Sequence, residues 1–284
     1  MTSEMTSCAL ATADGLDLAS RSWMPVEPSA VMVVVHGIAE HGGRYAWLAE
    51  RACAQGIGVV TLDLRGHGRS PGERSYVERF DDYLLDVDTL WMRARELAAG
   101  RPLFLLGHSM GGAIALRWAA QRRLPMAGLI LSSAALKIGG DGPRLLIALA
   151  PLLSRWQPHL RGTKLDPALI SRDPAQVAAY VNDPLVSLKA PPARTGAELL
   201  AAMESNRVAA AGLELPVYLF HGDGDRLTDP AGSREIFEAW RGADKTLRLW
   251  PGSRHETFND LDREAVVTEL LDWVRVHVPG AAGK

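Results

Sequence analysis

The sequence predicts an α/β fold, in which a mostly parallel central sheet is flanked by helices and a helical cap is inserted late in the sheet. Short apolar runs of strand length alternate with stretches of helical periodicity, which indicates a sheet covered on both faces. Residues 135–208 break this alternation, because they hold many prolines between short helical pieces. We therefore expect one domain over residues 1–284, with residues 135–208 as an inserted cap subdomain.

After two opening strands, the remaining elements are expected to alternate between helix and strand on both sides of this insertion. Before it, we expect strands over 16–23 and 31–35, a helix over 44–55, a strand over 58–63, a helix over 77–99, a strand over 103–106, a helix over 110–122 and a strand over 128–131. After it, we expect a strand over 216–220, a helix over 230–240, a strand over 246–250 and a helix over 263–276.

One motif lies between the strand expected over 103–106 and the helix expected over 110–122, and it indicates a nucleophilic serine. The run is Gly107-His108-Ser109-Met110-Gly111. A serine between a strand and a helix adopts a strained backbone conformation, and small flanking residues permit the sharp turn. The turn exposes the hydroxyl beside the free N–H groups of the helix N-terminus.

A serine nucleophile needs a base and an acid that orients the base, and this type of fold supplies them in the order Ser, Asp or Glu, His. Asp223 and Asp225 both follow the strand expected to end at residue 220. We favour Asp225, which is further out on the turn; either aspartate could instead cap local N–H groups. His255 follows the next strand and is the expected base, whereas His277 lies at the end of the last helix, where a cation is favourable in its own right.

The loop over residues 36–45 follows an early strand and is expected to supply a second oxyanion donor. We assign the backbone N–H of Ile38 to this role, and the backbone N–H of Met110, directly after Ser109, as the other oxyanion donor. His36 and His41 in the same loop are interpreted as local hydrogen-bonding residues, because no third metal ligand is apparent, and we expect no metal site. The turn over 63–70 lacks the ending of a phosphate-binding loop and is expected to be structural.

Composition excludes several other classes of function. The formal net charge of −2 and the lack of a basic run argue against nucleic-acid binding. We expect no transmembrane segment, because no window reaches about 18 apolar residues, and no secretory leader at the start, so a cytoplasmic location is expected. Cys8 and Cys53 fit neither a disulfide framework nor a metal site, and we expect buried free thiols.

Four motifs together resemble one known family. They are His36-Gly37-x-x-Glu40-His41-x-x-Arg44-Tyr45, Asp63-x-Arg65-Gly66-His67-Gly68-x-Ser70, Gly107-His108-Ser109-Met110-Gly111-Gly112 and, in the cap, Ser171-Arg172-Asp173-Pro174 with Tyr180-Val181-Asn182-Asp183-Pro184-Leu185. On these motifs the chain resembles the monoacylglycerol lipases and lysophospholipase-type serine hydrolases of the α/β-hydrolase fold over most of its length.

The resemblance implies a catalytic triad of Ser109, Asp225 and His255, with no cofactor, and an oxyanion hole at Ile38 and Met110. It also implies a small polar subsite for glycerol. The positions that match this subsite are Glu40, Arg44, His108 and Tyr180. Two alternatives stay open: Glu40 and Arg44 could form a salt bridge that braces their loop, and Tyr180 could pack with an exposed hydroxyl.

The cap carries an apolar segment with three possible uses. Its residues are Leu145, Leu146, Ile147, Leu149, Leu152, Leu153 and Trp156. We favour packing against the rest of the domain over the lining of an acyl pocket, and both over weak contact with a lipid surface at which the protein would be peripheral. Departures from the family pattern concentrate in residues 139–165, which bears on acyl-chain preference.

The expected function is hydrolysis of the carboxylic ester bond of monoacylglycerols through an acyl-enzyme. The alternatives are a lysophospholipase and a general short- or medium-chain carboxylesterase, because the same triad serves each. A non-catalytic ligand-binding member of the fold would require a broken triad, and all three residue types are present.

Overall fold

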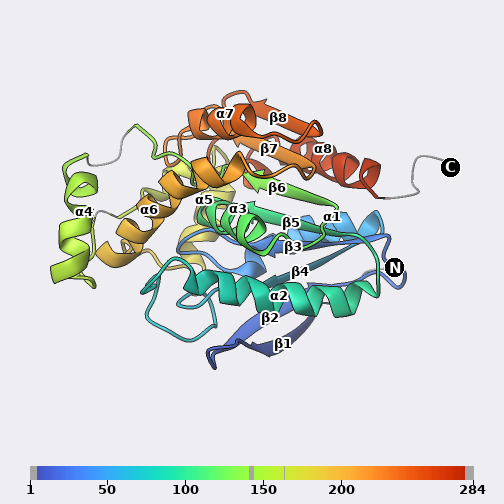
Figure 1. Cartoon of the computed structure of the whole chain (residues 1–284), viewed down its shortest axis with the longest axis horizontal. Helices are drawn as coiled ribbons and strands as arrows, with labels where there is room; N and C mark the ends of the chain where they lie inside the picture. Colours follow the sequence, from blue (N-terminus) through green and yellow to red (C-terminus); the bar gives the residue numbers. More distant parts are fainter. Residues whose placement is uncertain (1–4, 141–143, 163, 279–284) are drawn as a thin grey trace.

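A computed structural model describes residues 5–140, 144–162 and 164–278 of the chain. Within these residues, eight strands form one sheet in the order β1-β2-β4-β3-β5-β6-β7-β8 (Figure 1). The strands are β1 (Met5–Ala11), β2 (Asp17–Trp23), β3 (Ala30–Val35), β4 (Ile57–Leu62), β5 (Leu103–His108), β6 (Gly128–Ser132), β7 (Val217–Gly222) and β8 (Lys245–Trp250). Strand β2 pairs antiparallel with β1 and β4, and every other neighbouring pair is parallel. The expected mostly parallel sheet is confirmed.

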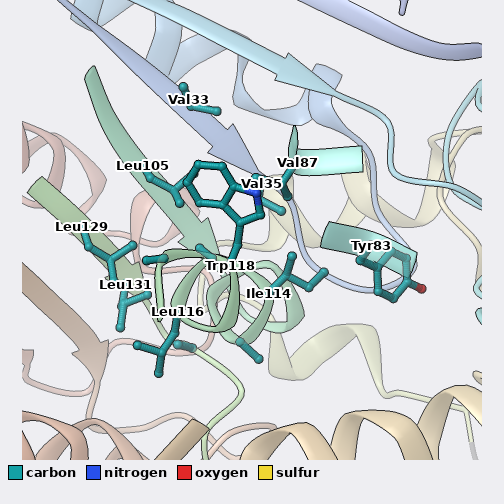
Figure 2. Packing of buried hydrophobic residues seen from close by; sticks show 14 of the residues in the cluster. Val33, Val35, Tyr83, Val87, Leu105, Ile114, Leu116, Trp118, Leu129 and Leu131 are labelled. Atoms are coloured by element: carbon teal, nitrogen blue, oxygen red, sulfur yellow. The ribbon is translucent and has the colours of Figure 1, made fainter. Parts of the chain in front are cut away.

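Helices cover both faces of the sheet because its central strands are apolar on both sides. The helices outside the insertion are α1 (Ala46–Ala54), α2 (Asp82–Ala98), α3 (Met110–Arg122), α7 (Pro230–Ala239) and α8 (Arg263–Val276). In β3, Val33 and Val35 belong to the core shared with α2, α3 and α7, whereas Met32 and Val34 belong to the core shared with α1 and α8. Figure 2 shows part of the first core, with Trp118 of α3 among the strand side chains.

The segment between β6 and β7 contributes helices and no strand of the sheet among its described residues. It contains α4 (Arg144–Trp156), the 3₁₀ turn η2 (Pro167–Leu169), α5 (Pro174–Asn182) and α6 (Ala193–Ala210). The prolines start elements here, because Asp166 and Asp173 cap η2 and α5 with a proline directly after each cap. Helix α6 packs on α3, and α4 packs on α6. Helix α4 lies at one end of the described part of the molecule (Figure 1). None of the described helices is long and apolar enough to cross a membrane.

Two boundaries differ from the sequence expectation, and contacts from distant residues explain the first of them. Helix α2 begins at Asp82 instead of residue 77. The N–H groups of Val77 and Phe80 donate instead to Thr195 and Glu198 of α6, which holds this stretch in a turn. Residues 42–45 form the 3₁₀ turn η1 (Gly42–Tyr45), and α1 begins only after it.

The strand β1 was not anticipated, and its cysteine differs from the sequence expectation. Strand β1 lies at the edge of the sheet and is largely exposed, so it lacks the apolar run that marks the central strands. The expectation of buried thiols is wrong: Cys8 is exposed on β1, where its Sγ lies 3.2 Å from Ser20 Oγ, and Cys53 on α1 is only partly buried. An edge strand leaves one side without a partner and both faces thinly covered, which explains the exposure.

Candidate active site

Ser109 lies in the sharp turn between β5 and α3, as the flanking glycines predict. Its backbone has φ 53° and ψ −121°, a positive φ that costs a non-glycine residue energy. A Cβ added to Gly107 would lie 2.3 Å from the carbonyl oxygen of Gly111, and one added to Gly111 would lie 2.1 Å from that of Val35. Ser109 makes no side-chain cap to α3, so its hydroxyl is not committed to the helix.

Asp225 and His255 are in direct contact although 30 residues separate them. They follow β7 and β8, whose carboxyl ends are adjacent because the two strands are parallel. The Nδ1–H of His255 donates to Oδ2 of Asp225 at 2.7 Å, and both side chains are buried. Of the two aspartates left open by the sequence, Asp223 is exposed and its Oδ1 accepts the N–H of Gly252 at 2.5 Å. The carboxylate that faces His255 is therefore that of Asp225.

The surroundings of Asp225 keep it ionised. Its Oδ1 accepts the N–H groups of Leu227 and Thr228, and its Oδ2 also accepts the hydroxyl of Thr228 at 2.8 Å. The Nε2 of His221 lies 3.0 Å from the same Oδ2. Burial opposes ionisation, but His255 and His221 outweigh it and hold the pKa of Asp225 far below its usual range. The sequence reasoning missed His221 and Thr228; their one signal is that they share the turn of Asp225.

The contact between Asp225 and His255 also raises the pKa of His255. Burial on its own would lower that pKa, but the carboxylate of Asp225 stabilises the imidazolium and the net pKa lies above 6.5. His277, the alternative base, is elsewhere: at the C-terminus of α8 its Nε2 lies 2.9 Å from Asp244 Oδ2. The Nδ1–H of His277 donates to the carbonyl oxygen of Trp273, so this residue completes a helix end.

A largely apolar cavity of about 340 Å³ opens onto Ser109 and His255. One wall comes from α6, with Leu199, Leu200 and Met203, and another from Ala150 and Leu153 of α4. Ile38, from the loop after β3, also lines the cavity. Met110 is the first residue of α3, so its N–H is among the four that have no partner within a helix.

Polar residues enter the cavity at the end near Ser109. They include Glu40, His108 and Glu256, together with Tyr180 from α5 of the insertion. Arg44 is not among the residues that line the cavity. Its guanidinium instead donates to Glu40 and Glu256, so the salt-bridge interpretation describes its contacts. Glu256 was missed by the sequence reasoning, and its one signal is that it follows His255 directly.

His108 is held neutral beside His255. The two ring centroids are 4.9 Å apart, and burial together with repulsion by His255 lowers the pKa of His108 to about 4. The Nδ1 of His108 lies 3.2 Å from the carbonyl oxygen of Ser132, which can only accept, so Nδ1 carries the proton. The Nε2 atom of His108 is therefore an acceptor.

The histidines of the loop after β3 combine local contacts with contacts to distant segments, so the expectation of local hydrogen bonds holds only in part. The Nδ1–H of His36 donates to the carbonyl oxygen of Gly37, and its Nε2 accepts the N–H of Leu64 at 2.9 Å. His41 Nε2 lies 2.8 Å from Asp183 Oδ2. Asp63 accepts N–H groups and the guanidinium of Arg21, which gives the 63–70 turn a structural role. Within the described part of the chain, no group of three or more His, Cys, Asp or Glu residues could hold a metal ion.

The apolar segment of the insertion divides between cavity and surface. Leu153 faces the cavity, whereas Leu149, Leu152 and Trp156 are exposed. The side chains of Leu145, Leu146 and Ile147 lie outside the described residues, so the expectation for them stays a prediction.

Residues 26–262 match the family described as Serine aminopeptidase, S33. The chain belongs to this family. Over 257 residues it is 36% identical to the monoacylglycerol lipase of Mycolicibacterium smegmatis, and the aligned residues make up 90% of this chain and 92% of that one. It is 35% identical to the phospholipase YtpA of Bacillus subtilis, over 86% of this chain and 95% of that one. The crystal structure of the Paleococcus ferrophilus monoacylglycerol lipase matches with a TM-score of 0.83 at 34% identity, covering 92% of this chain and 99% of that one. The S33 chain thus has the α/β-hydrolase fold that the motifs predict.

Proposed function

We propose that this protein hydrolyses the ester bond of monoacylglycerols to a fatty acid and glycerol. The observation that carries the proposal is the apolar cavity that ends at Ser109 and at the buried His255–Asp225 pair. An apolar cavity suits an acyl chain, and the polar residues at its inner end suit a small alcohol. The names of the relatives of this chain support the same substrate class.

Ser109 is the proposed nucleophile and His255 the proposed base. The Oγ of Ser109 attacks the ester carbonyl while Nε2 of His255 takes the hydroxyl proton. Asp225 holds the other proton on Nδ1 and stabilises the imidazolium. The backbone N–H groups of Ile38 and Met110 donate to the oxyanion, and each such donor lowers the barrier by about 3 kcal/mol.

Collapse of this intermediate breaks the bond to the alcohol, and the leaving oxygen takes the proton from His255. Water then enters, gives its proton to His255 and attacks the acyl group on Ser109. The second collapse releases the fatty acid and returns the proton to the Oγ of Ser109. The cycle restores both residues and consumes one water, so it needs no cofactor.

Glycerol hydroxyls are proposed to bind at the polar end of the cavity. Glu40 and the Nε2 atom of His108 can accept hydrogen bonds, and the hydroxyl of Tyr180 can donate or accept. Arg44 contributes there by holding Glu40 in place. The cap interpretation of residues 135–208 fits this assignment, because Tyr180 enters the cavity from that segment.

The decisive experiment compares wild-type protein and Ser109→Ala in labelling by a fluorophosphonate and in hydrolysis of monoacylglycerols of graded chain length. Wild type is expected to label and turn over, and the variant to do neither at an unchanged melting temperature. Hydrolysis retained by the variant would disprove the role of Ser109.

Lysophospholipid hydrolysis is the second candidate, favoured by the relative named a phospholipase. Lysophospholipids and simple p-nitrophenyl esters in the same panel separate the candidates. Equal rates on all three classes would indicate a general carboxylesterase and contradict a monoacylglycerol specialist.

Contact with a lipid surface is proposed for the outer face of α4. Leu152 and Trp156 there are 57% and 70% exposed. The test is sedimentation with phospholipid vesicles, in which wild type is expected to bind more than Leu152→Ser/Trp156→Ser; equal recovery of both in the supernatant removes this proposal. The expected cytoplasmic location with peripheral lipid contact stays a prediction.

A further inference from the structure

A buried arginine joins the two loops that approach Ser109 from opposite sides. Nη1 of Arg44 donates to Oε2 of Glu40 at 2.8 Å and to Oε1 of Glu256 at 2.6 Å, and Nη2 donates to Oε2 of Glu256 at 2.7 Å. Arg44 and Glu40 belong to the segment after β3, and Glu256 belongs to the loop after β8. The ion pair therefore spans 212 residues of sequence.

One end of this ion pair contacts the residue before a group of the proposed mechanism, and the other end follows such a group directly in sequence. Oε1 of Glu40 accepts the N–H of Gly37 at 2.6 Å, and Gly37 directly precedes the oxyanion donor Ile38. Glu256 directly follows the base, His255. A continuous chain of short hydrogen bonds thus runs from the oxyanion loop, through Arg44, to the loop of the base.

This series of hydrogen bonds is rigid because the side chains that form it are buried and have further partners. The side chains of Arg44, Glu40 and Glu256 are all more than nine-tenths buried. Burial opposes ionisation of Glu256, but Arg44 overcomes it and lowers the pKa of Glu256 to about 2. Asn259 donates to Oε2 of Glu256 at 3.0 Å, and the ring of Tyr180 covers the guanidinium at 4.7 Å. A bidentate arginine–carboxylate pair out of water fixes direction as well as distance.

We propose that Glu256 is a positioning residue, which, through its bidentate pair with Arg44, sets the separation between the oxyanion donor at Ile38 and the base His255. Neither residue needs to touch the reacting atoms for this role. Displacement of catalytic groups by about 1 Å slows reactions by roughly 100-fold, so loss of this connection is expected to have a measurable effect. The hydrogen-bonded connection Glu40–Arg44–Glu256 is called the strut below. The inference rests on the proposed roles of Ser109, Ile38 and His255, and it is independent of which ester is the natural substrate.

The test is Glu256→Gln, which keeps the size of the side chain but turns an amide donor toward Arg44. Two quantities are measured: the rate of fluorophosphonate labelling, and kcat and KM on a short p-nitrophenyl ester. We expect the labelling rate and kcat to fall about 10- to 100-fold, with KM changed less than about twofold and the melting temperature retained. The matched control is Glu264→Gln, whose carboxylate pairs with Arg51 at the surface and is 65% exposed; it is expected to match wild type.

A second comparison separates the strut from a local effect on His255. If Glu40, Arg44 and Glu256 act as one unit, Glu40→Gln also slows labelling, and the double variant is about as slow as the slower single one. Full additivity of the two effects, or a Glu256→Gln variant with wild-type labelling, overturns the proposal.

A milder variant covers the case in which Glu256→Gln does not fold. Asn259→Ala removes one hydrogen bond to Glu256 and leaves Arg44 untouched. It is expected to slow labelling several-fold at an unchanged melting temperature, and an unchanged rate contradicts the strut. If wild type labels but does not cleave monoacylglycerols, the proposed substrate fails while the strut remains testable by labelling.

Discussion

Replacement of Asp225 by asparagine isolates the electrostatic part of the proposed mechanism. The side chain accepts hydrogen bonds on both oxygens, from two backbone N–H groups on Oδ1 and from His255 and Thr228 on Oδ2. An asparagine can satisfy only one of these two sides with its single oxygen. If the oxygen stays with the backbone N–H groups of Leu227 and Thr228, the amide NH₂ faces Nδ1 of His255.

The amide then favours the wrong tautomer of His255, with the proton on Nε2, which cannot accept the proton of Ser109. The carboxylate that stabilises the buried imidazolium is also lost. In a catalytic triad this change lowers kcat by about 10⁴, or roughly 5 kcal/mol of transition-state stabilisation. The fold is expected to survive, because the backbone contacts of residue 225 are retained.

The assay is kcat on a p-nitrophenyl ester, with the melting temperature measured in parallel. Asp223→Asn is the matched control from the same turn, since its exposed side chain keeps an oxygen for the N–H of Gly252. We expect activity near that of wild type for Asp223→Asn and a loss of about 10⁴ for Asp225→Asn. Loss of activity in Asp223→Asn with retention in Asp225→Asn would refute the reasoning.

Two further predictions concern pH and chain length. His255 must be neutral to accept a proton, and Asp225 raises its pKa above 6.5. We therefore expect kcat/KM to rise with pH through a midpoint above 6.5. A profile of kcat/KM from about pH 5 to pH 9 checks this, and a midpoint below 6.5 contradicts it. Leu199→Trp fills part of the cavity and is expected to move the preferred monoacylglycerol to shorter acyl chains. Val208 lies on the same helix and is 72% exposed, so Val208→Trp is expected to leave the preference unchanged. An identical preference in both variants would show that α6 does not limit the length of the acyl chain.

Periodicity predicted the central strands well because burial on both faces leaves a local signal. The strands β3, β4 and β5 are buried at every position and largely apolar, and they were predicted to within three residues at each end. Strand β1 was missed because an exposed edge strand carries no such run. The start of α2 was misplaced because Thr195 and Glu198, more than 100 residues away, bind the N–H groups of Val77 and Phe80.

The candidate site divides in the same way. The turn at Ser109 was predictable because its strain and its glycines are properties of five consecutive residues. The contacts of Arg44 were not predictable, because the sequence leaves contact with substrate and a salt bridge equally open. The second partner of Arg44, Glu256, lies 212 residues away and carries no motif recognised in the sequence reasoning.

Local sequence patterns were enough to predict the alternation of strands and helices, the helical stretch between β6 and β7, and the position of Ser109 at a strand-to-helix turn. These follow from local properties: side-chain periodicity, proline and glycine geometry, and backbone strain. Three features depend on contacts between distant segments: Asp225 rather than Asp223 faces His255, Arg44 joins two loops, and Cys8 is exposed. Each of these depends on which distant segments the sheet brings together, and on the water that their contacts exclude.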